Sequence, residues 1–216
     1  MTPEGQSERL QLAYLALPLK DELRTGWVQH GVQDAESVAA HSWGTAYLCL
    51  LFAEAAGVDR GRAVEIAVLH DLAEAFTGDY ATRLDPRDRQ VTEDAKAEGE
   101  RAAMEELLPP AANGLRELWL AYEERSSPEA VFVRDMNLLD MCLQGLKYER
   151  DGRYDPNVLI PSRGGHRHLD EFFAGAEHRF SGALARQLFE TVYAWYVEAR
   201  DAAPAADAAD MRDRTA

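Results

Sequence analysis

The apolar residues of this chain recur with helical spacing along most of its length. Positions three and four apart share apolar character, and period-two alternation bounded by tight hairpin dipeptides is scarce. Proline, glycine and capping residues set the expected ends of the helices. The predicted helices cover residues 7–17, 36–56, 60–76, 88–108, 114–124, 128–149 and 181–200. The pattern therefore predicts an all-α protein that folds as a compact helical bundle.

Length and composition favour one globular unit. The chain has 216 residues, of which 46% are apolar and 28% are charged, and these values are ordinary for a folded domain. We therefore expect a single domain over residues 1–200. Residues 201–216 are rich in Ala and Asp and offer little surface to bury, so we expect a mobile C-terminal tail.

The charge of the chain limits its partners. A net charge of −15 disfavours binding to a nucleic-acid polymer. It leaves a small phosphorylated substrate open, because one metal ion and one arginine can reverse the local field. The N-terminus carries no apolar signal segment, and no run of 18 apolar residues predicts a membrane span. We expect a cytoplasmic protein, with Cys49 and Cys142 as buried thiols.

The candidate chemistry lies in the segment Val-Leu-His-Asp-Leu-Ala-Glu-Ala-Phe-Thr-Gly-Asp at residues 68–79. His70 and Asp71 are adjacent at the end of an apolar helix, and Glu74 follows four residues after His70, on the same helical face. Asp79 comes just beyond the helix, where its carboxylate can reach back. Imidazole beside carboxylate suits a divalent metal of intermediate hardness, such as Mn, Co, Zn, Ni or Fe.

A second histidine completes this pattern from another helix. His41 shares its predicted face with Val38, Thr45 and Leu48, so we expect it to point into the bundle. A lone interior histidine is usually a hydrogen-bonded core residue. The combination with His70-Asp71 is hard to explain as packing, because burying several imidazoles and carboxylates without partners is costly. The sequence therefore predicts a metal site.

These segments resemble the HD-domain 5′-deoxynucleotidase family, within the wider HD phosphohydrolase superfamily. The resemblance runs from about residue 10 to residue 150, and the last helix matches more loosely. The similar stretches are Arg24-Thr-Gly-Trp27, Glu36-Ser-Val-Ala-Ala-His41, residues 70–79 and residues 119–148. The resemblance implies a homodimeric phosphohydrolase acting on 5′-(deoxy)nucleoside monophosphates or a related nucleotide. Histidines that would hold a second metal soon after His70 are missing, so one divalent ion is expected.

The resemblance also implies a role for each matching residue. The metal ligands would be His41, His70 and Asp71, and the catalytic carboxylates would be Glu74 and Asp79. Glu74 would accept a proton or position the attacking water, and Asp79 would protonate the leaving 5′-oxygen or hold the sugar hydroxyl. Trp27 would pack near the sugar. Arg24 lies two residues before the position of the family's phosphate-binding arginine, and it is our candidate for that role.

This chain departs from the family pattern at three positions. Ala40 precedes the first histidine, where the family usually has an acidic residue. Gly26 precedes the tryptophan, where the family usually has its phosphate-binding arginine. The fourth metal ligand, an aspartate in the family, falls on Asn137, so either Asn137 binds weakly, or Asp140 replaces it one turn later, or the affinity for metal is reduced.

Two other functions fit these departures. The chain could be a non-catalytic nucleotide-binding or regulatory HD-like domain with a weakened metal site. It could also be a related enzyme that acts on a modified nucleotide. Retention of both Glu74 and Asp79 favours an enzyme, because a pure binding module has little need for both carboxylates.

Overall fold

The computed structural model describes residues 2–81, 90–108, 112–157, 166 and 168–202. Within these ranges it is all-α, as predicted, and Leu23 and Ser37 form an isolated β-bridge. None of the described helices has the length and apolarity needed to cross a lipid bilayer. The elements are α1 (Pro3–Leu15), η1 (Leu17–Lys20), α2 (Thr25–Gln29), α3 (Val38–Ala56), α4 (Arg60–Leu69), α5 (Glu74–Thr77), α6 (Glu93–Leu107), α7 (Asn113–Glu124), α8 (Pro128–Asp151), α9 (Asp170–Glu177) and α10 (Ala183–Ala202).

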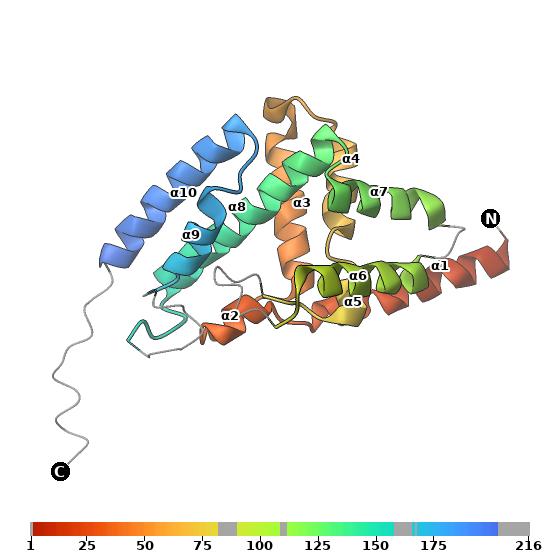
Figure 1. The fold of residues 1–216 in the computed structure, drawn as a ribbon, viewed down its shortest axis with the longest axis horizontal. Coiled ribbons are helices and arrows are strands. Elements are labelled where there is room, and N and C mark those ends of the chain that lie inside the picture. Colours follow the sequence, from red (N-terminus) through yellow and green to blue (C-terminus); the bar gives the residue numbers. More distant parts are fainter. Residues whose placement is uncertain (1, 82–89, 109–111, 158–165, 167, 203–216) are drawn as a thin grey trace, which may run out of the picture.

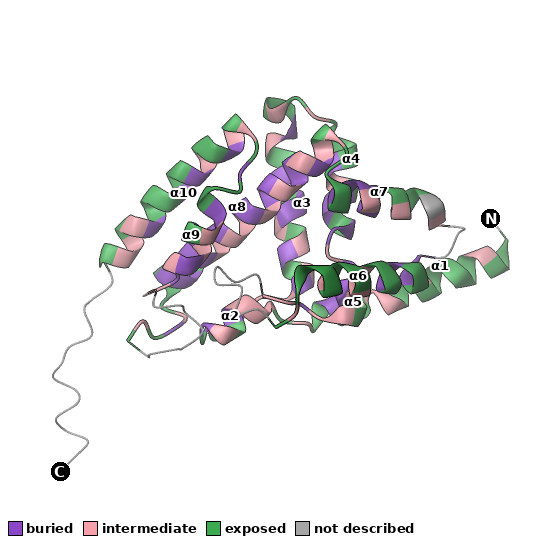
Figure 2. Cartoon of the chain, in the orientation of Figure 1, coloured by how far each residue is buried: buried purple, intermediate pink, exposed green. Residues whose placement is uncertain are grey.

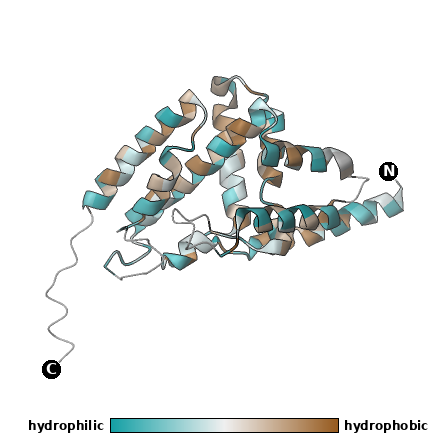
Figure 3. Cartoon of the chain, in the orientation of Figure 1, coloured by the Kyte–Doolittle hydropathy of each residue, from teal (hydrophilic) through white to brown (hydrophobic). Residues whose placement is uncertain are grey.

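Helix α8 is the centre of the bundle. It packs against α3 and α4 on one side and against α9 and α10 on another (Figure 1). Its buried positions recur around much of its circumference, so that α8 carries more buried surface than the peripheral helices α1 and α6 (Figure 2). Helix α6 is largely hydrophilic, as expected for a helix that covers the bundle from outside (Figure 3). The polar groups of the candidate site therefore lie beside a well-packed helix.

Helix α3 begins and ends where its local chemistry requires. The Ser37 side chain accepts a hydrogen bond from the backbone of Ala40, and Gly57 closes the helix with φ +71°. The predicted inner face of this helix is confirmed, because Val38, His41, Thr45 and Leu48 are all buried.

The prediction of one continuous helix over residues 60–76 is wrong, because the stretch contains two helices with a break between them. Helix α4 ends at Leu69, and α5 starts only at Glu74. Between them the backbone forms turns that are tighter than those of an α-helix. The backbone nitrogens of Leu72 and Glu74 donate to the carbonyl oxygens of Leu69 and Asp71, three residues earlier. The break projects His70 and Asp71 from the end of α4 toward the core.

Three short elements were not predicted: η1, α2 and α9. Each spans two turns or fewer, which is too short for apolar periodicity to reveal. Helix α9 is held by tertiary contacts instead, and Phe173 stacks on Tyr196 of α10 with ring centroids 3.8 Å apart. These elements matter because α2 and α9 line the candidate site.

Other sequence predictions are confirmed or lie outside the described residues. Both cysteines are buried free thiols. Helix α10 extends through Ala202, two residues into the segment expected to be a tail, and residues 203–216 lie outside the described part of the chain. The stretch from residue 151 to residue 165 carries Gly, Pro and Arg, which predicts an irregular loop, and the structure describes it only as far as residue 157.

Candidate metal centre and active site

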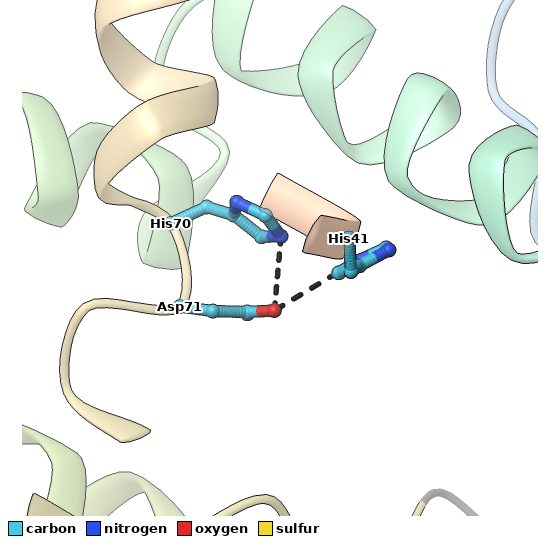
Figure 4. A group of neighbouring side chains, drawn as sticks. All are labelled: His41, His70 and Asp71. Carbon is cyan, nitrogen blue, oxygen red and sulfur yellow. Dashed lines mark ion pairs between the residues drawn. The ribbon is translucent and has the colours of Figure 1, made fainter. Parts of the chain in front are cut away.

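The three predicted metal ligands meet in the core. His41 comes from α3, and His70 and Asp71 come from the turn after α4. The Oδ2 atom of Asp71 lies 3.1 Å from Nε2 of His70 and 3.7 Å from Nε2 of His41 (Figure 4). One ligand atom from each of the three residues lies within 4.8 Å of the other two. The Nε2 atoms of His41 and His70 and the Oδ2 atom of Asp71 therefore converge on a single point.

Hydrogen bonds at the far nitrogens fix how the two imidazoles face this point. Nδ1 of His70 lies 2.7 Å from the carbonyl oxygen of Ala67, and Nδ1 of His41 lies 2.7 Å from Oδ2 of Asp140. An acceptor at Nδ1 favours the tautomer with its proton there, which leaves a lone pair on Nε2. Both Nε2 atoms are buried and have no hydrogen-bond partner. A divalent metal would satisfy both nitrogens and Asp71, so the residues present fit a metal ion.

Asp140 belongs to this centre through His41. Its carboxylate lies against Gly44 of α3, where an added Cβ would come within 2.0 Å of Oδ1. Asp140 binds the Nδ1 side of His41, whereas the converging point lies on the Nε2 side. The structure therefore places Asp140 where it orients a ligand, and does not place it among the converging ligand atoms.

Asn137 lies on the cavity wall beside the centre. Its Nδ2 donates to the Tyr122 hydroxyl over 2.7 Å. The Tyr122 ring in turn lies edge-on to His70, with centroids 5.2 Å apart. Asn137 is thus held next to the metal-binding groups, in agreement with its position in the sequence pattern.

Arg24 neutralises a group of carboxylates at the edge of the centre. Its Nη1 lies 2.8 Å from Asp79, 3.4 Å from Asp71 and 3.9 Å from Glu74. The second oxygen of Asp79 accepts from the backbone nitrogen of Thr25 over 2.6 Å. Burial by itself would lower the pKa of Arg24, but the three carboxylates outweigh it and raise that pKa. Burial likewise raises the pKa of Asp71, and the charges of His70 and Arg24 reverse this effect.

Glu74 is the carboxylate whose environment is least suited to a negative charge. It is buried, and its Oε2 atom has no hydrogen-bond partner. Burial and the charges of Asp71 and Asp79 raise the pKa of Glu74 well above its ordinary value, while Arg24 and Lys96 oppose the shift. Lys96 of α6, with Nζ 3.7 Å from Oε1 of Glu74, was not predicted from the sequence.

Most of these groups, including Arg24, His70, Asp71 and Glu74, line one cavity of about 500 Å³, part of whose wall is apolar. Trp27 lies in that wall but is only 2% exposed, because Tyr148 and Phe172 cover it. The rings of Trp27 and Phe172 have centroids 3.9 Å apart. Gly26 permits this, since a Cβ there would come within 3.1 Å of Phe172. Phe172 of α9 therefore presents the more accessible ring to the cavity.

Several cavity residues escaped the sequence prediction. Tyr122 and Arg134 lie in stretches that carry the family resemblance, so those stretches held a signal for them. No sequence signal pointed to Lys96 or Phe172. Lys96 lies on a charged helix, and Phe172 lies on a helix that is too short to be predicted. His30, considered as a cavity residue, does line the cavity and is buried between the Gly26 carbonyl and Glu171.

Comparison with known proteins adds independent evidence. A family model described as HD domain matches residues 17–168. The 5′-deoxynucleotidase HDDC2 of Danio rerio is 34% identical over 176 residues, which cover 79% of this chain and 79% of the relative. The 5′-deoxynucleotidase HDDC2 of Homo sapiens is 35% identical over 159 residues, covering 72% of this chain and 74% of the relative.

Solved structures share the same helical arrangement. A crystal structure from Pyrococcus horikoshii matches with a TM-score of 0.64 and 29% identity, covering 87% of this chain and 98% of that chain. A crystal structure from Magnetospirillum magnetotacticum, described as a predicted metal-dependent phosphohydrolase, matches with a TM-score of 0.62 and 28% identity. It covers 90% of this chain and 92% of that chain.

Proposed function

Because this chain belongs to the HD domain family, we propose that it is a metal-dependent phosphohydrolase that releases phosphate from 5′-(deoxy)nucleoside monophosphates. The observation that carries the proposal is the pair of buried, unpartnered Nε2 atoms on His41 and His70, which converge on Asp71. His70 and Asp71 line a cavity of about 500 Å³, within the usual size range for small-molecule sites. The 5′-deoxynucleotidase relatives support the choice of substrate class.

A divalent ion held by His41, His70 and Asp71 would offset negative charge on the phosphoryl group and lower the pKa of a water molecule. Glu74 lies next to Asp71 in the cavity and has an unpartnered oxygen, so we assign it the handling of the proton of the attacking water. Asn137 would be the fourth group around the ion. The physiological metal among Mn, Co, Zn, Ni and Fe is left to experiment.

Arg24 and Asp79 would act as a pair. Both oxygens of Asp79 accept hydrogen bonds, one from Arg24 and one from the Thr25 backbone. We therefore propose that Asp79 holds Arg24 in place, and that Arg24, which is 18% exposed, contacts the phosphate from its edge of the cavity. This arrangement favours a positioning role for Asp79 over protonation of the leaving oxygen.

The decisive experiment measures phosphate release from a panel of 5′-ribo- and 5′-deoxyribonucleotides with Mn, Co or Zn added. Wild type is compared with Asp71→Ala and with Asp151→Ala, a matched change at an exposed aspartate paired with Lys147. We expect release to depend on metal, to be lost in Asp71→Ala and to persist in Asp151→Ala. The absence of release from folded wild type with every metal would overturn the proposal.

A non-catalytic nucleotide-binding domain is the second candidate, and Asn137 is the observation that favours it. An amide supplies no negative charge where the family pattern has a carboxylate. This candidate predicts that metal and nucleotide bind without any release of phosphate. Calorimetric titration of nucleotide beside the release assay separates the two functions.

We also propose that two copies of the chain associate through the outer face of α3. Trp43, Tyr47, Leu50 and Leu51 are each about half exposed or more, and the rings of Trp43 and Tyr47 are stacked. These positions follow helical spacing, opposite the buried face that carries His41. Sedimentation of wild type and of Trp43→Glu tests this, and a dimer that survives the substitution would argue against this face. A cytoplasmic location stays a prediction from the sequence.

A further inference from the structure

Two arginines that line the cavity form no ion pair with the carboxylates that the structure describes there, which include Glu93 and Glu123. Arg134 of α8 and Arg179, two residues beyond α9, both line the cavity. Arg24 and Lys96, which also line it, lie within 4.0 Å of carboxylates. Among the residues that the structure describes, neither Arg134 nor Arg179 forms an ion pair. In a chain with a net charge of −15, two unpaired cations on one cavity wall indicate a site for an anion.

The two guanidinium groups are close enough to affect each other. Desolvation and the charges of Arg134 and Arg125 lower the pKa of Arg179, although its side chain is exposed to solvent, and Tyr122 and Glu93 only partly oppose the shift. The nearest acidic side chain on α8 is already engaged, because Asp135 accepts hydrogen bonds from the backbone of Ser181 and Gly182, each at 2.8 Å. An anion between the arginines would relieve their repulsion and would gain charge-assisted hydrogen bonds.

The two arginines lie beside the metal centre, in a part of the cavity that is distinct from it. Arg134 precedes Asn137 by three residues on α8, so both project from one side of the helix into the cavity. Asn137 bonds to Tyr122, and Tyr122 contacts His70. The cavity thus has two parts of different charge. The acidic, metal-binding part lies near α4 and α5, and the basic part starts at Arg134, one turn of α8 away from Asn137.

We propose that Arg134 and Arg179 form an anion subsite that binds a second phosphate of the substrate while the phosphate to be released lies at the metal centre. The inference rests on the proposed function and extends its substrates from nucleoside 5′-monophosphates to nucleotides that carry a second phosphate group. Water supplies a hydroxyl to the phosphorus of the released group, and the oxygen of the broken P–O bond takes the proton. The second phosphate stays on the product. It is either a 3′-phosphate on the sugar or the inner phosphate of a 5′-diphosphate.

The test compares kcat/KM for deoxyadenosine 5′-monophosphate, 3′,5′-bisphosphate and 5′-diphosphate. The proteins are wild type, Arg134→Gln, Arg179→Gln, the double variant, and Arg60→Gln as a matched change at an exposed arginine paired with Glu54. We expect wild type to prefer one of the two-phosphate compounds, and the identity of that compound tells the two sources apart. Each cavity variant should lower this preference about tenfold, and Arg60→Gln should keep it. Circular dichroism melting verifies that each variant folds.

Binding to the metal-free protein gives a readout that does not depend on turnover. Calorimetry should show tighter binding of the preferred two-phosphate compound than of the monophosphate, by about tenfold, and equal binding in the double variant. If wild type releases no phosphate but keeps this binding preference, the proposed function fails and the subsite stands. If wild type shows no preference, or if the variants lower rates for all three compounds equally, the subsite is wrong.

Discussion

Nδ1 of His41 and Oδ2 of Asp140 lie 2.7 Å apart, across the interface between α3 and α8. The contact is possible because Gly44, one turn after His41, leaves room for the carboxylate. Asp140 thereby points the Nε2 lone pair of His41 at Asp71 and His70. One residue of α8, 99 positions away in sequence, sets the orientation of a proposed metal ligand on α3.

Asp140→Asn should weaken metal binding by about 10- to 100-fold, as losses of a partner to a metal-bound histidine typically do. The amide removes the negative charge that helps to hold the Nδ1 side of His41 in place. Gly44→Ala should act in the same direction, since its Cβ would displace the carboxylate. Competition with a chelator measures the affinity, and Asp151→Asn serves as the surface control. Unchanged affinity in Asp140→Asn would show that the contact does not support the metal site.

Asn137→Asp should increase metal affinity, by about tenfold or more, because it places a carboxylate beside the two imidazoles. The Tyr122 hydroxyl, now 2.7 Å from the Asn137 amide, can donate to that carboxylate. The same chelator competition measures the effect, with Asn137→Ala alongside. If neither substitution changes the affinity, Asn137 is not the fourth ligand.

Glu74→Gln should keep the metal and lose turnover by at least about 10²-fold, the usual effect of removing a general acid or base. The amide preserves the shape of this buried side chain but cannot exchange a proton. Metal content by mass spectrometry and initial rates on the preferred nucleotide test both parts. Near-normal turnover would remove Glu74 from the mechanism.

Phe172→Ala should raise KM for nucleotides and leave the metal affinity unchanged. Phe172 presents its ring to the cavity beside Trp27, and a nucleobase stacked on an aromatic ring gains about 1–3 kcal/mol. The substrate 2-deoxyribose 5-phosphate, which lacks a base, provides the control. If KM rises equally for both substrates, Phe172 acts on the packing of the cavity and not on the base.

Both cysteines should resist alkylation in the folded protein. Cys49 and Cys142 are fully buried, and desolvation raises the pKa of Cys49 to about 12. The thiolate that reacts is therefore scarce near neutral pH. Titration with a chromogenic disulfide should detect no thiol in native protein and both after denaturation. Rapid labelling of the native protein would indicate that the α3–α8 interface opens.

The sequence by itself determined the helical architecture and the groups that we predict to bind metal. The pattern of apolar positions placed Val38, His41, Thr45 and Leu48 on one buried face, because helical spacing depends on local geometry alone. The adjacent pair His70-Asp71 at the end of an apolar helix was equally local. Its resemblance to a known family linked this pair to Glu74, Asp79, Arg24 and Trp27, and the structure brings these six residues to one cavity.

Only the tertiary structure decided which distant side chains complete the site. The contact of Asp140 with His41 and the packing of Phe172 on Trp27 each join segments far apart in the sequence, and the break after Leu69 directs His70 and Asp71 toward the core. Nothing in the local pattern encodes them, because α9 is too short to show periodicity and the position of α8 depends on packing against α3 and α4. That Arg134 and Arg179 form no ion pair within the described part of the chain is likewise visible only once the carboxylates of that part have been placed.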